Sequence, residues 1–160
     1  MLPFHIIQVA DLIAWSDNVH ILNIEINDDT FVVIEDKTGT SEHDNQLERY
    51  KSTAEDYYAG KRDKFYYIYL KTGNEPSSTQ EHIASKGYRV ITRKMILNVL
   101  SSYTGKNDIL IDFMNHLCNI ENETNSFKTK QIKDWSWYAW QGFYMELEKW
   151  YEDMYWEYVA

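Results

Sequence analysis

Two neighbouring segments near the N-terminus carry the hydrophobic pattern of β-strands. Residues 19–26 (VHILNIEI) and 30–37 (TFVVIEDK) are rich in β-branched residues, and the polar run at 27–29 is a turn signal. Together they predict an antiparallel hairpin. The segment 65–71 (FYYIYLK) is apolar almost throughout, which is typical of a strand buried on both faces. Residues 88–91 (YRVI) predict a short fourth strand.

Helical periodicity follows the hairpin and returns after the fourth strand. Ser41 and Asp44 have the spacing of a capping box, which predicts a helix from this point to about Tyr58. The polar residues 73–80 predict a loop. Residues 93–103 have the apolar spacing of an amphipathic helix.

The C-terminal part of the chain predicts two further helices. Residues 111–120 show helical spacing, and the polar stretch 121–130 predicts a loop. Residues 135–159 predict a long helix that is kinked near Gly142. Because strands and helices alternate along the chain, the predicted fold class is α/β. The apolar stripe of the last helix would consist of Trp137, Trp140, Tyr144, Leu147, Tyr151, Met154 and Tyr158.

Length and composition set the class of protein. The 160 residues, 44% of them hydrophobic, fit a single globular domain over residues 1–160. Cys118 is the only cysteine, which excludes an internal disulfide framework and a multi-cysteine zinc site, and fits a reducing cytoplasm. We find no signal-peptide pattern and no apolar run of about 18 residues, so we expect no membrane segment.

The formal charge of −9 argues against a general nucleic-acid binder, which would be basic. It does not exclude an enzyme that acts on nucleic acid, because a few local cations can hold phosphates and bound metal ions reverse the sign of an acidic site. The candidates for phosphate contacts are Lys61, Arg62, Lys64, Lys86, Arg89, Arg93 and Lys94.

A carboxylate and an amine end the second strand. Strand side chains alternate, so Glu35 and Lys37 share a face and Asp36 points to the other. The carboxylate can ligate Mg²⁺, and the amine can orient an attacking water and offset negative charge on a phosphate. Glu-x-Lys is a common pair, and alone it is more typical of a surface ion pair than of a catalytic site.

The next predicted helix adds two polar side chains. Gln46 and Tyr50 are four residues apart, so they lie on one helical face, which can turn toward the end of the preceding strand. Gln46 could then support a metal-bound water or a phosphate. The alternative is that Gln46 is a solvated first-turn residue and Tyr50 belongs to the core.

The segment 32–50 (VVIEDKTGTSEHDNQLERY) resembles the metal-site motifs of the PD-(D/E)XK nuclease superfamily, especially bacterial members with a Q-x-x-x-Y helix. The similarity extends from about residue 18 to the end, through the strand at 64–78, the segment 87–100 and the aromatic tail. The resemblance implies a restriction-endonuclease-like fold with a central mixed β-sheet flanked by helices. It also implies Mg²⁺- or Mn²⁺-dependent hydrolysis of nucleic acid, most simply DNA, with Glu35, Lys37 and Gln46 as catalytic residues and Tyr50 in support.

The sequence departs from the family at the first acidic position. His20 stands where the family has an aspartate, and imidazole is a poor ligand for Mg²⁺. Asp17 or Glu25 could supply the missing carboxylate, and Asp17 is the better substitute because Glu25 lies on the strand face opposite to His20. His20 could instead bind a softer ion such as Mn²⁺, or the protein could have lost activity.

Two functions therefore stay open. The first is a metal-dependent DNA nuclease. The second is a catalytically degenerate protein of the same fold that acts as a binding or interaction module. The aromatic C-terminal region, with most of the six tryptophans, also fits a homodimer interface. Compared with similar proteins, the chain fits a domain shortened at both ends.

Overall fold

The structure is a computed structural model, and the chain divides into two compact units. Unit 1 contains residues 1–70 and 82–90, and unit 2 contains residues 71–81 and 91–160. Each is described by itself, and the expectation of one domain stays a prediction. The described residues are 7–8, 21–26, 30–40, 45–57 and 64–151.

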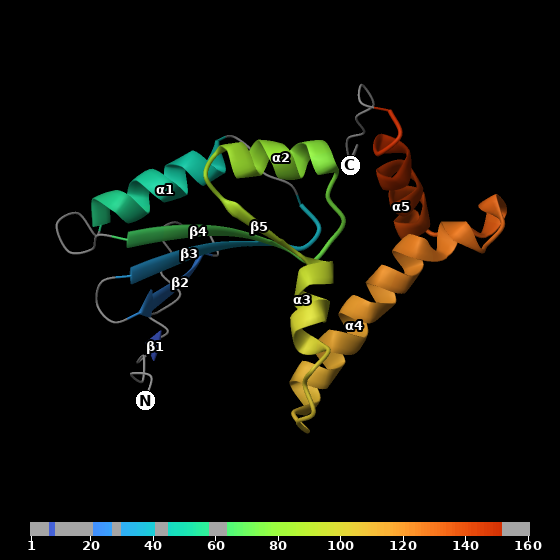
Figure 1. Ribbon diagram of the computed structural model, residues 1–160, viewed down its shortest axis with the longest axis horizontal. Coiled ribbons are helices and arrows are strands. Elements are labelled where there is room, and N and C mark those ends of the chain that lie inside the picture. Colours follow the sequence, from blue (N-terminus) through green and yellow to red (C-terminus); the bar gives the residue numbers. More distant parts are fainter. Residues whose placement is uncertain (1–6, 9–20, 27–29, 41–44, 58–63, 152–160) are drawn as a thin grey trace. The chain divides into compact units, whose positions relative to one another are not determined.

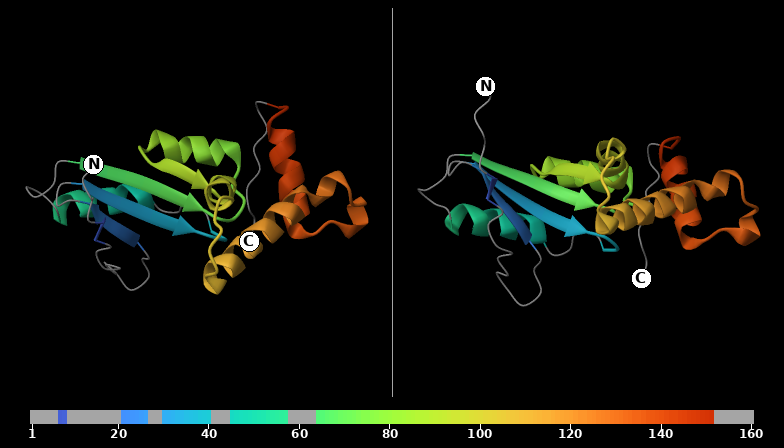
Figure 2. Two further views of the ribbon diagram at one scale, coloured as in Figure 1. Left: turned by 60° about the horizontal axis from the view of Figure 1, so that its bottom comes forward. Right: turned by 90° about the horizontal axis from the view of Figure 1, so that it is seen from below.

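Within the described residues the sheet has five strands, in the order β1-β2-β3-β4-β5. The predicted hairpin is confirmed, because β2 and β3 pair antiparallel with Ile21 opposite Glu35 and Ile26 opposite Thr30. In Figure 2 the arrows of β3 and β4 point the same way, so the sheet is mixed. The strands are β1 (Ile7–Gln8), β2 (Ile21–Ile26), β3 (Thr30–Lys37), β4 (Lys64–Lys71) and β5 (Arg89–Thr92).

The core of unit 1 forms where α1 (Gln46–Tyr57) lies along one face of the sheet (Figure 1). Strand alternation turns Phe31 and Val33 toward this helix, and helical spacing turns Leu47 toward the sheet. Burying each of these side chains contributes about 1.5–3 kcal/mol. The buried cluster consists of Phe31, Val33, Leu47, Tyr50, Ala54, Tyr67, Tyr69, Ile83 and Tyr88.

Strand β4 is buried on one face and not on both. Tyr67 and Tyr69 belong to the core, whereas Tyr66 on the other face is 55% exposed. A tyrosine can stay in water through its hydroxyl group, so an aromatic-rich strand does not require two covered faces. The prediction of burial on both faces was therefore wrong.

Helix α1 begins at Gln46, and the proposed capping pair Ser41 and Asp44 lies outside the described residues. Asn45, directly before the helix, has φ of 53° in the left-handed region, which asparagine tolerates better than most residues. Its carbonyl oxygen accepts the Arg49 N–H at 3.1 Å. The left-handed residue and this hydrogen bond mark the start of the helix.

Unit 2 is helical after β5. Asn107 caps α4 by accepting the Leu110 N–H at 2.9 Å. Helix α4 includes the first five residues, 121–125, of the stretch expected to be a loop. None of the described helices is long and apolar enough to cross a membrane. The elements are α3 (Arg93–Leu100), α4 (Asp108–Asn125), the 3₁₀ turns η1 (Ser126–Lys128) and η2 (Ile132–Asp134), and α5 (Trp137–Glu148).

Helix α5 does not bury the stripe that its sequence suggests. Trp137 of that stripe is 61% exposed. The buried positions are instead Ala139, Gln141 and Gly142. A Cβ at Gly142 would lie 1.9 Å from the carbonyl oxygen of Thr124, so only glycine permits α5 to approach α4 this closely. The glycine serves helix packing, and α5 continues through it.

One helix, α2 (Ser77–Ser85), was missed; it begins within the loop expected at 73–80 and continues beyond it. The carboxylate of Glu148 accepts the backbone N–H groups of Ser77 at 2.8 Å and Ser78 at 3.1 Å. This carboxylate satisfies the free donors at the start of the helix, as a local capping side chain would. Because Glu148 is 71 residues away from Ser77, no local pattern could show the cap.

Candidate functional site

The end of β3 holds a buried carboxylate beside an amine. Glu35 is only 3% exposed, and the Lys37 ammonium lies 3.0 Å from its Oε1 atom. Asp36 between them is exposed, as strand alternation requires. Removing a carboxylate from water is costly unless a cation and hydrogen bonds compensate it, so this pair is a demanding arrangement at a strand end.

Helix α1 brings two further polar groups to the same place. The Lys37 ammonium donates to Gln46 Oε1 at 2.8 Å, and the Gln46 side-chain amide donates in turn to the Tyr50 hydroxyl. This contact joins the end of β3 to the first residue of α1, nine positions further along the chain. The structure thus joins the residues that the sequence singled out, and their catalytic roles stay predictions.

The environment keeps the Tyr50 hydroxyl protonated near neutral pH. Burial raises the pKa of Tyr50, the hydrogen bond from Gln46 acts in the opposite direction, and the negative charge of Glu35 raises the pKa further. A neutral Tyr50 hydroxyl can accept a hydrogen bond from the Gln46 side-chain N–H. This bond orients the Gln46 amide so that its Oε1 atom faces the Lys37 ammonium. Tyr50 therefore orients a polar chain and carries no charge itself.

Asn23 of β2 is a residue that sequence reasoning missed. It lies opposite Val33, which makes it a diagonal neighbour of Glu35 on the same sheet face. The side chain is 2% exposed, and its Oδ1 atom has no hydrogen-bond partner among the described residues. An unsatisfied buried oxygen is costly and requires a reason. The available signal was a polar residue on the core face of an apolar strand.

Metal binding at this site can be examined through its oxygen donors. The Glu35 carboxylate and the Asn23 amide oxygen are the hard donors that Mg²⁺ and Mn²⁺ prefer, so the described residues fit such an ion. Asp17 and His20 lie outside the described residues. Glu25 lies opposite Phe31, four positions or about 13 Å along β3 from Glu35, and is too far to share an ion.

Within the described residues there is no cluster of three or more His, Cys, Asp or Glu side chains. The basic residues proposed for phosphate contacts differ in their surroundings. Lys86 pairs with Glu48 at 3.1 Å, and Arg93 is buried in unit 2. Lys64 and Arg89 are exposed, and Lys94 is exposed in unit 2; Lys61 and Arg62 lie outside the described residues.

Comparison with known families agrees with this geometry. The family model for the PD-(D/E)XK nuclease superfamily matches residues 12–154, and the chain belongs to this superfamily. The mixed sheet and its flanking helices form an α/β, restriction-endonuclease-like fold. Membership indicates nuclease-type activity and nucleic-acid binding, and such nucleases generally use divalent metal ions. No curated protein and no solved structure gives a significant match to the chain.

Proposed function

We propose that this protein is a metal-dependent nuclease that hydrolyses phosphodiester bonds of DNA. The observation that carries the proposal is the contact between the buried Glu35, the ammonium of Lys37 and the amide of Gln46. A surface ion pair would not be buried and would not extend into an ordered polar chain. The arrangement instead provides a carboxylate and an amine at fixed positions, as phosphodiester hydrolysis requires.

Glu35 and Asn23 would hold the divalent cation, either Mg²⁺ or Mn²⁺. We propose Asp17 as a further carboxylate ligand and His20 as the alternative for Mn²⁺. When bound, the cation lowers the pKa of a bound water and offsets charge on the phosphate. The Lys37 ammonium, 3.0 Å from Glu35 Oε1, offsets the negative charge of the buried carboxylate.

Lys37 positions the attacking water and stabilises negative charge that develops on the phosphate. Its ammonium is oriented from one side by Glu35 and from the other by Gln46, so little rotational freedom is lost when substrate arrives. Gln46 is fixed in turn by Tyr50. These two residues of α1 act by holding the ammonium in place.

The test compares cleavage by three variants. Purified protein is incubated with supercoiled plasmid, single-stranded DNA or RNA, in Mg²⁺, Mn²⁺ or EDTA. We expect Lys37→Ala and Glu35→Gln to lower the rate about 100-fold or more. Lys37→Ala removes a positive charge beside the reacting phosphate, and Glu35→Gln removes the carboxylate charge that would hold the cation. Asp36→Asn is the matched control, since this exposed carboxylate lies on the same strand and faces away.

The outcomes separate the two candidate functions. If Lys37→Ala cleaves as fast as the parent, the site is wrongly assigned. If the parent cleaves no nucleic acid with any metal, the protein is the alternative, a binding module on a degenerate nuclease fold. Cleavage of RNA but not DNA would support the assigned catalytic site and show that the substrate is RNA.

A second measurement addresses the metal ligands directly. Binding of Mn²⁺ is followed by electron paramagnetic resonance in the parent and in Asn23→Leu, Asp17→Asn and His20→Ala. We expect the substitution of each residue that binds the cation to weaken the Mn²⁺ affinity by at least tenfold. Asp36→Asn should bind as the parent does. Unchanged affinity in Asn23→Leu would remove Asn23 from the ligand set.

We also propose a homodimer through the aromatic C-terminal region. Trp137 is 61% exposed, Trp150 is 75% exposed and Tyr151 is 61% exposed, and aromatic residues of this kind are enriched in protein interfaces. Sedimentation equilibrium tests the association. A dimeric parent and a monomeric Trp150→Glu variant would support it, whereas a monomeric parent at all concentrations would contradict it.

A further inference from the structure

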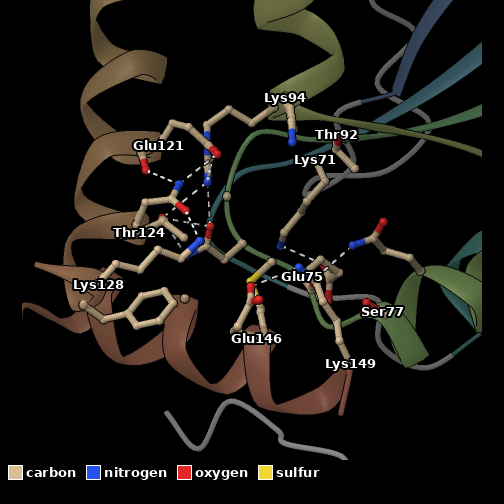
Figure 3. A pocket seen from close by; sticks show the side chains of 18 residues that line it. Lys71, Glu75, Ser77, Thr92, Lys94, Glu121, Thr124, Lys128, Glu146 and Lys149 are labelled. Atoms are coloured by element: carbon tan, nitrogen blue, oxygen red, sulfur yellow. Dashed lines mark hydrogen bonds and ion pairs between the residues drawn. The ribbon is translucent and has the colours of Figure 1, made fainter. Parts of the chain in front are cut away.

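Unit 2 contains a polar cavity of its own. Its volume is about 370 Å³, and its walls come from the segment after β4, the start of α3, the end of α4, η1 and the later part of α5. Figure 3 shows this space with its lysine and glutamate side chains around it. None of Glu35, Lys37 and Gln46 lines it, so the cavity has no part in the proposed catalytic chemistry.

The wall of the cavity is ordered by Arg93, which is 5% exposed. Its guanidinium donates to the Thr72 carbonyl at 2.8 Å, to Asn74 Oδ1 at 2.7 Å and to Glu121 Oε2 at 2.9 Å. Asn74 donates in turn to Gln141 Oε1 at 2.8 Å. Because these buried groups satisfy one another, the wall is pre-organised and can receive a ligand without rearranging.

The charges around the cavity do not balance. Five cationic and three anionic side chains line it, so two positive charges are in excess within a chain of net charge −9. Each carboxylate already has a cation of its own. The pairs are Glu75 with Lys71 at 3.0 Å, Glu121 with Arg93 at 2.9 Å, and Glu146 with Lys149 at 3.1 Å.

Two lysines of the cavity, Lys94 and Lys128, form no ion pair with a carboxylate of the described residues. Lys94 of α3 has no hydrogen bond or ion pair with any described residue. Lys128 of η1 makes a weak contact of 3.4 Å with Asn125 Oδ1 and lies 5.4 Å from the centre of the Phe127 ring. The hydrogen bond from its lysine partner is the main cause that lowers the pKa of Glu146, and the charge of Lys128 adds to it without forming an ion pair with that carboxylate. In Figure 3 both lysines extend toward the cavity from different elements. Like charges that line one cavity repel one another, and a bound anion would offset this repulsion.

We propose that this cavity binds the phosphate group of a ligand about the size of a single nucleotide. Lys94 and Lys128 supply the charge, and Thr92, whose side chain makes no capping bond to α3, leaves the donors at the start of that helix available. Phe127 provides an apolar wall beside them. A volume of about 370 Å³ is that of a small-ligand pocket and excludes a duplex.

The phosphate could belong to a free mononucleotide or to the end of a nucleic-acid strand. Only the second source rests on the proposed nuclease function. The two are distinguished by the ligands used in the test, which are adenosine 5′-monophosphate, adenosine, and a short single-stranded oligonucleotide with either a 5′-phosphate or a 5′-hydroxyl and a 3′-fluorophore.

Binding is measured by fluorescence anisotropy and by competition in EDTA, so that no cleavage occurs. The test variant is Lys94→Gln with Lys128→Gln, and the matched control is Lys106→Gln with Lys133→Gln, which removes two exposed lysines of the same unit outside the cavity. Substitutions of exposed lysines usually leave stability nearly unchanged, and thermal melting verifies this for both. The variant Lys94→Arg with Lys128→Arg retains both positive charges and is a second control.

We expect the parent to prefer a phosphorylated ligand over its unphosphorylated counterpart by roughly tenfold. The preference should disappear in the Lys94/Lys128→Gln variant and persist in the Lys106/Lys133→Gln control and in the Lys94/Lys128→Arg variant. Competition by adenosine 5′-monophosphate identifies a free nucleotide as the ligand, and preference only for the phosphorylated strand identifies a strand end. No phosphate preference in the parent, or an equal loss in the control, would overturn the proposal.

The same samples separate this inference from the proposed function. A Glu35→Gln variant should keep its phosphate preference, because Glu35 does not line the cavity. A parent that binds with phosphate preference but cleaves nothing would refute the nuclease proposal alone. A parent that cleaves DNA without any phosphate preference would refute the cavity proposal alone.

Discussion

The two units differ in the polarity of the side chains that they bury. In unit 1, Phe31, Leu47 and Tyr69 are completely buried and form an apolar core. In unit 2, Arg93 and Asn74 are also buried, and the Arg93 guanidinium donates a hydrogen bond to the Asn74 side chain. Apolar burial is non-directional and adds up residue by residue, whereas a buried polar network is stable only when every member is satisfied. The two units should therefore respond differently to single substitutions.

The largest effect is expected where the polar network loses its centre. Arg93→Leu should lower the free energy of unfolding by about 3–5 kcal/mol, because it leaves the Glu121 carboxylate and the Asn74 amide without their cation. Urea unfolding followed by circular dichroism measures it. Arg89→Leu, at an exposed position, is the control.

A double variant sharpens this result. If Arg93→Leu is destabilising because it leaves the Glu121 carboxylate without its cation, the double variant Arg93→Leu with Glu121→Leu should recover part of the lost free energy of unfolding. Replacing a whole ion pair by apolar groups is often neutral. A double variant that is less stable than Arg93→Leu would mean that Glu121 has another role.

A substitution in the apolar core of unit 1 should lower the free energy of unfolding somewhat less than Arg93→Leu does. Leu47→Ala removes a fully buried side chain and should cost about 3 kcal/mol, without any partner substitution that restores it. Thermal and urea unfolding give the value. Ile109→Ala, at an 82% exposed position, should change stability little. A loss below about 1 kcal/mol for Leu47→Ala would show that unit 1 is loosely packed.

The contact between α4 and α5 allows a third comparison. Gly142→Ala should cost about 2 kcal/mol, because the new Cβ would collide with the Thr124 carbonyl and push the helices apart. Gly39→Ala introduces the same methyl group where nothing lies within 4 Å and serves as control. Equal melting temperatures for both variants would contradict the close approach.

The smallest effect concerns alkaline pH. Burial and a hydrogen bond to Glu55 raise the pKa of Tyr67 above its ordinary value. A raised pKa in the folded state contributes stability that is complete below about pH 10 and is lost as the pH rises further, because the unfolded tyrosine ionises first. Tyr67→Phe should cost about 1 kcal/mol at neutral pH but flatten this alkaline decline.

Tyr66→Phe is the control for that measurement, since Tyr66 lies on the same strand and is 55% exposed. Unfolding by urea is recorded between pH 7 and about pH 11. The interpretation is wrong if the parent and Tyr67→Phe decline in parallel above pH 10.

Much of unit 1 could be read from the sequence because its information is local. Alternation predicted the hairpin of β2 and β3, and the same rule placed Glu35 and Lys37 on one face. Four-residue spacing put Gln46 and Tyr50 together on the following helix, where they contact each other. The position of Asn23 required the register of the hairpin, which pattern alone does not supply.

Unit 2 shows what the sequence by itself could not determine. Its amphipathic pattern indicated helices, yet the buried face of α5 is formed by Gln141 and Gly142 and not by the aromatic stripe. Likewise, α2 begins where Glu148 caps it, and Arg93 is buried because Glu121 and Asn74 surround it. These choices depend on polar groups that meet only after folding. Hydrophobic periodicity specifies which residues leave water, whereas the tertiary structure decides which polar residues can leave it with them, since each needs a partner within about 3 Å.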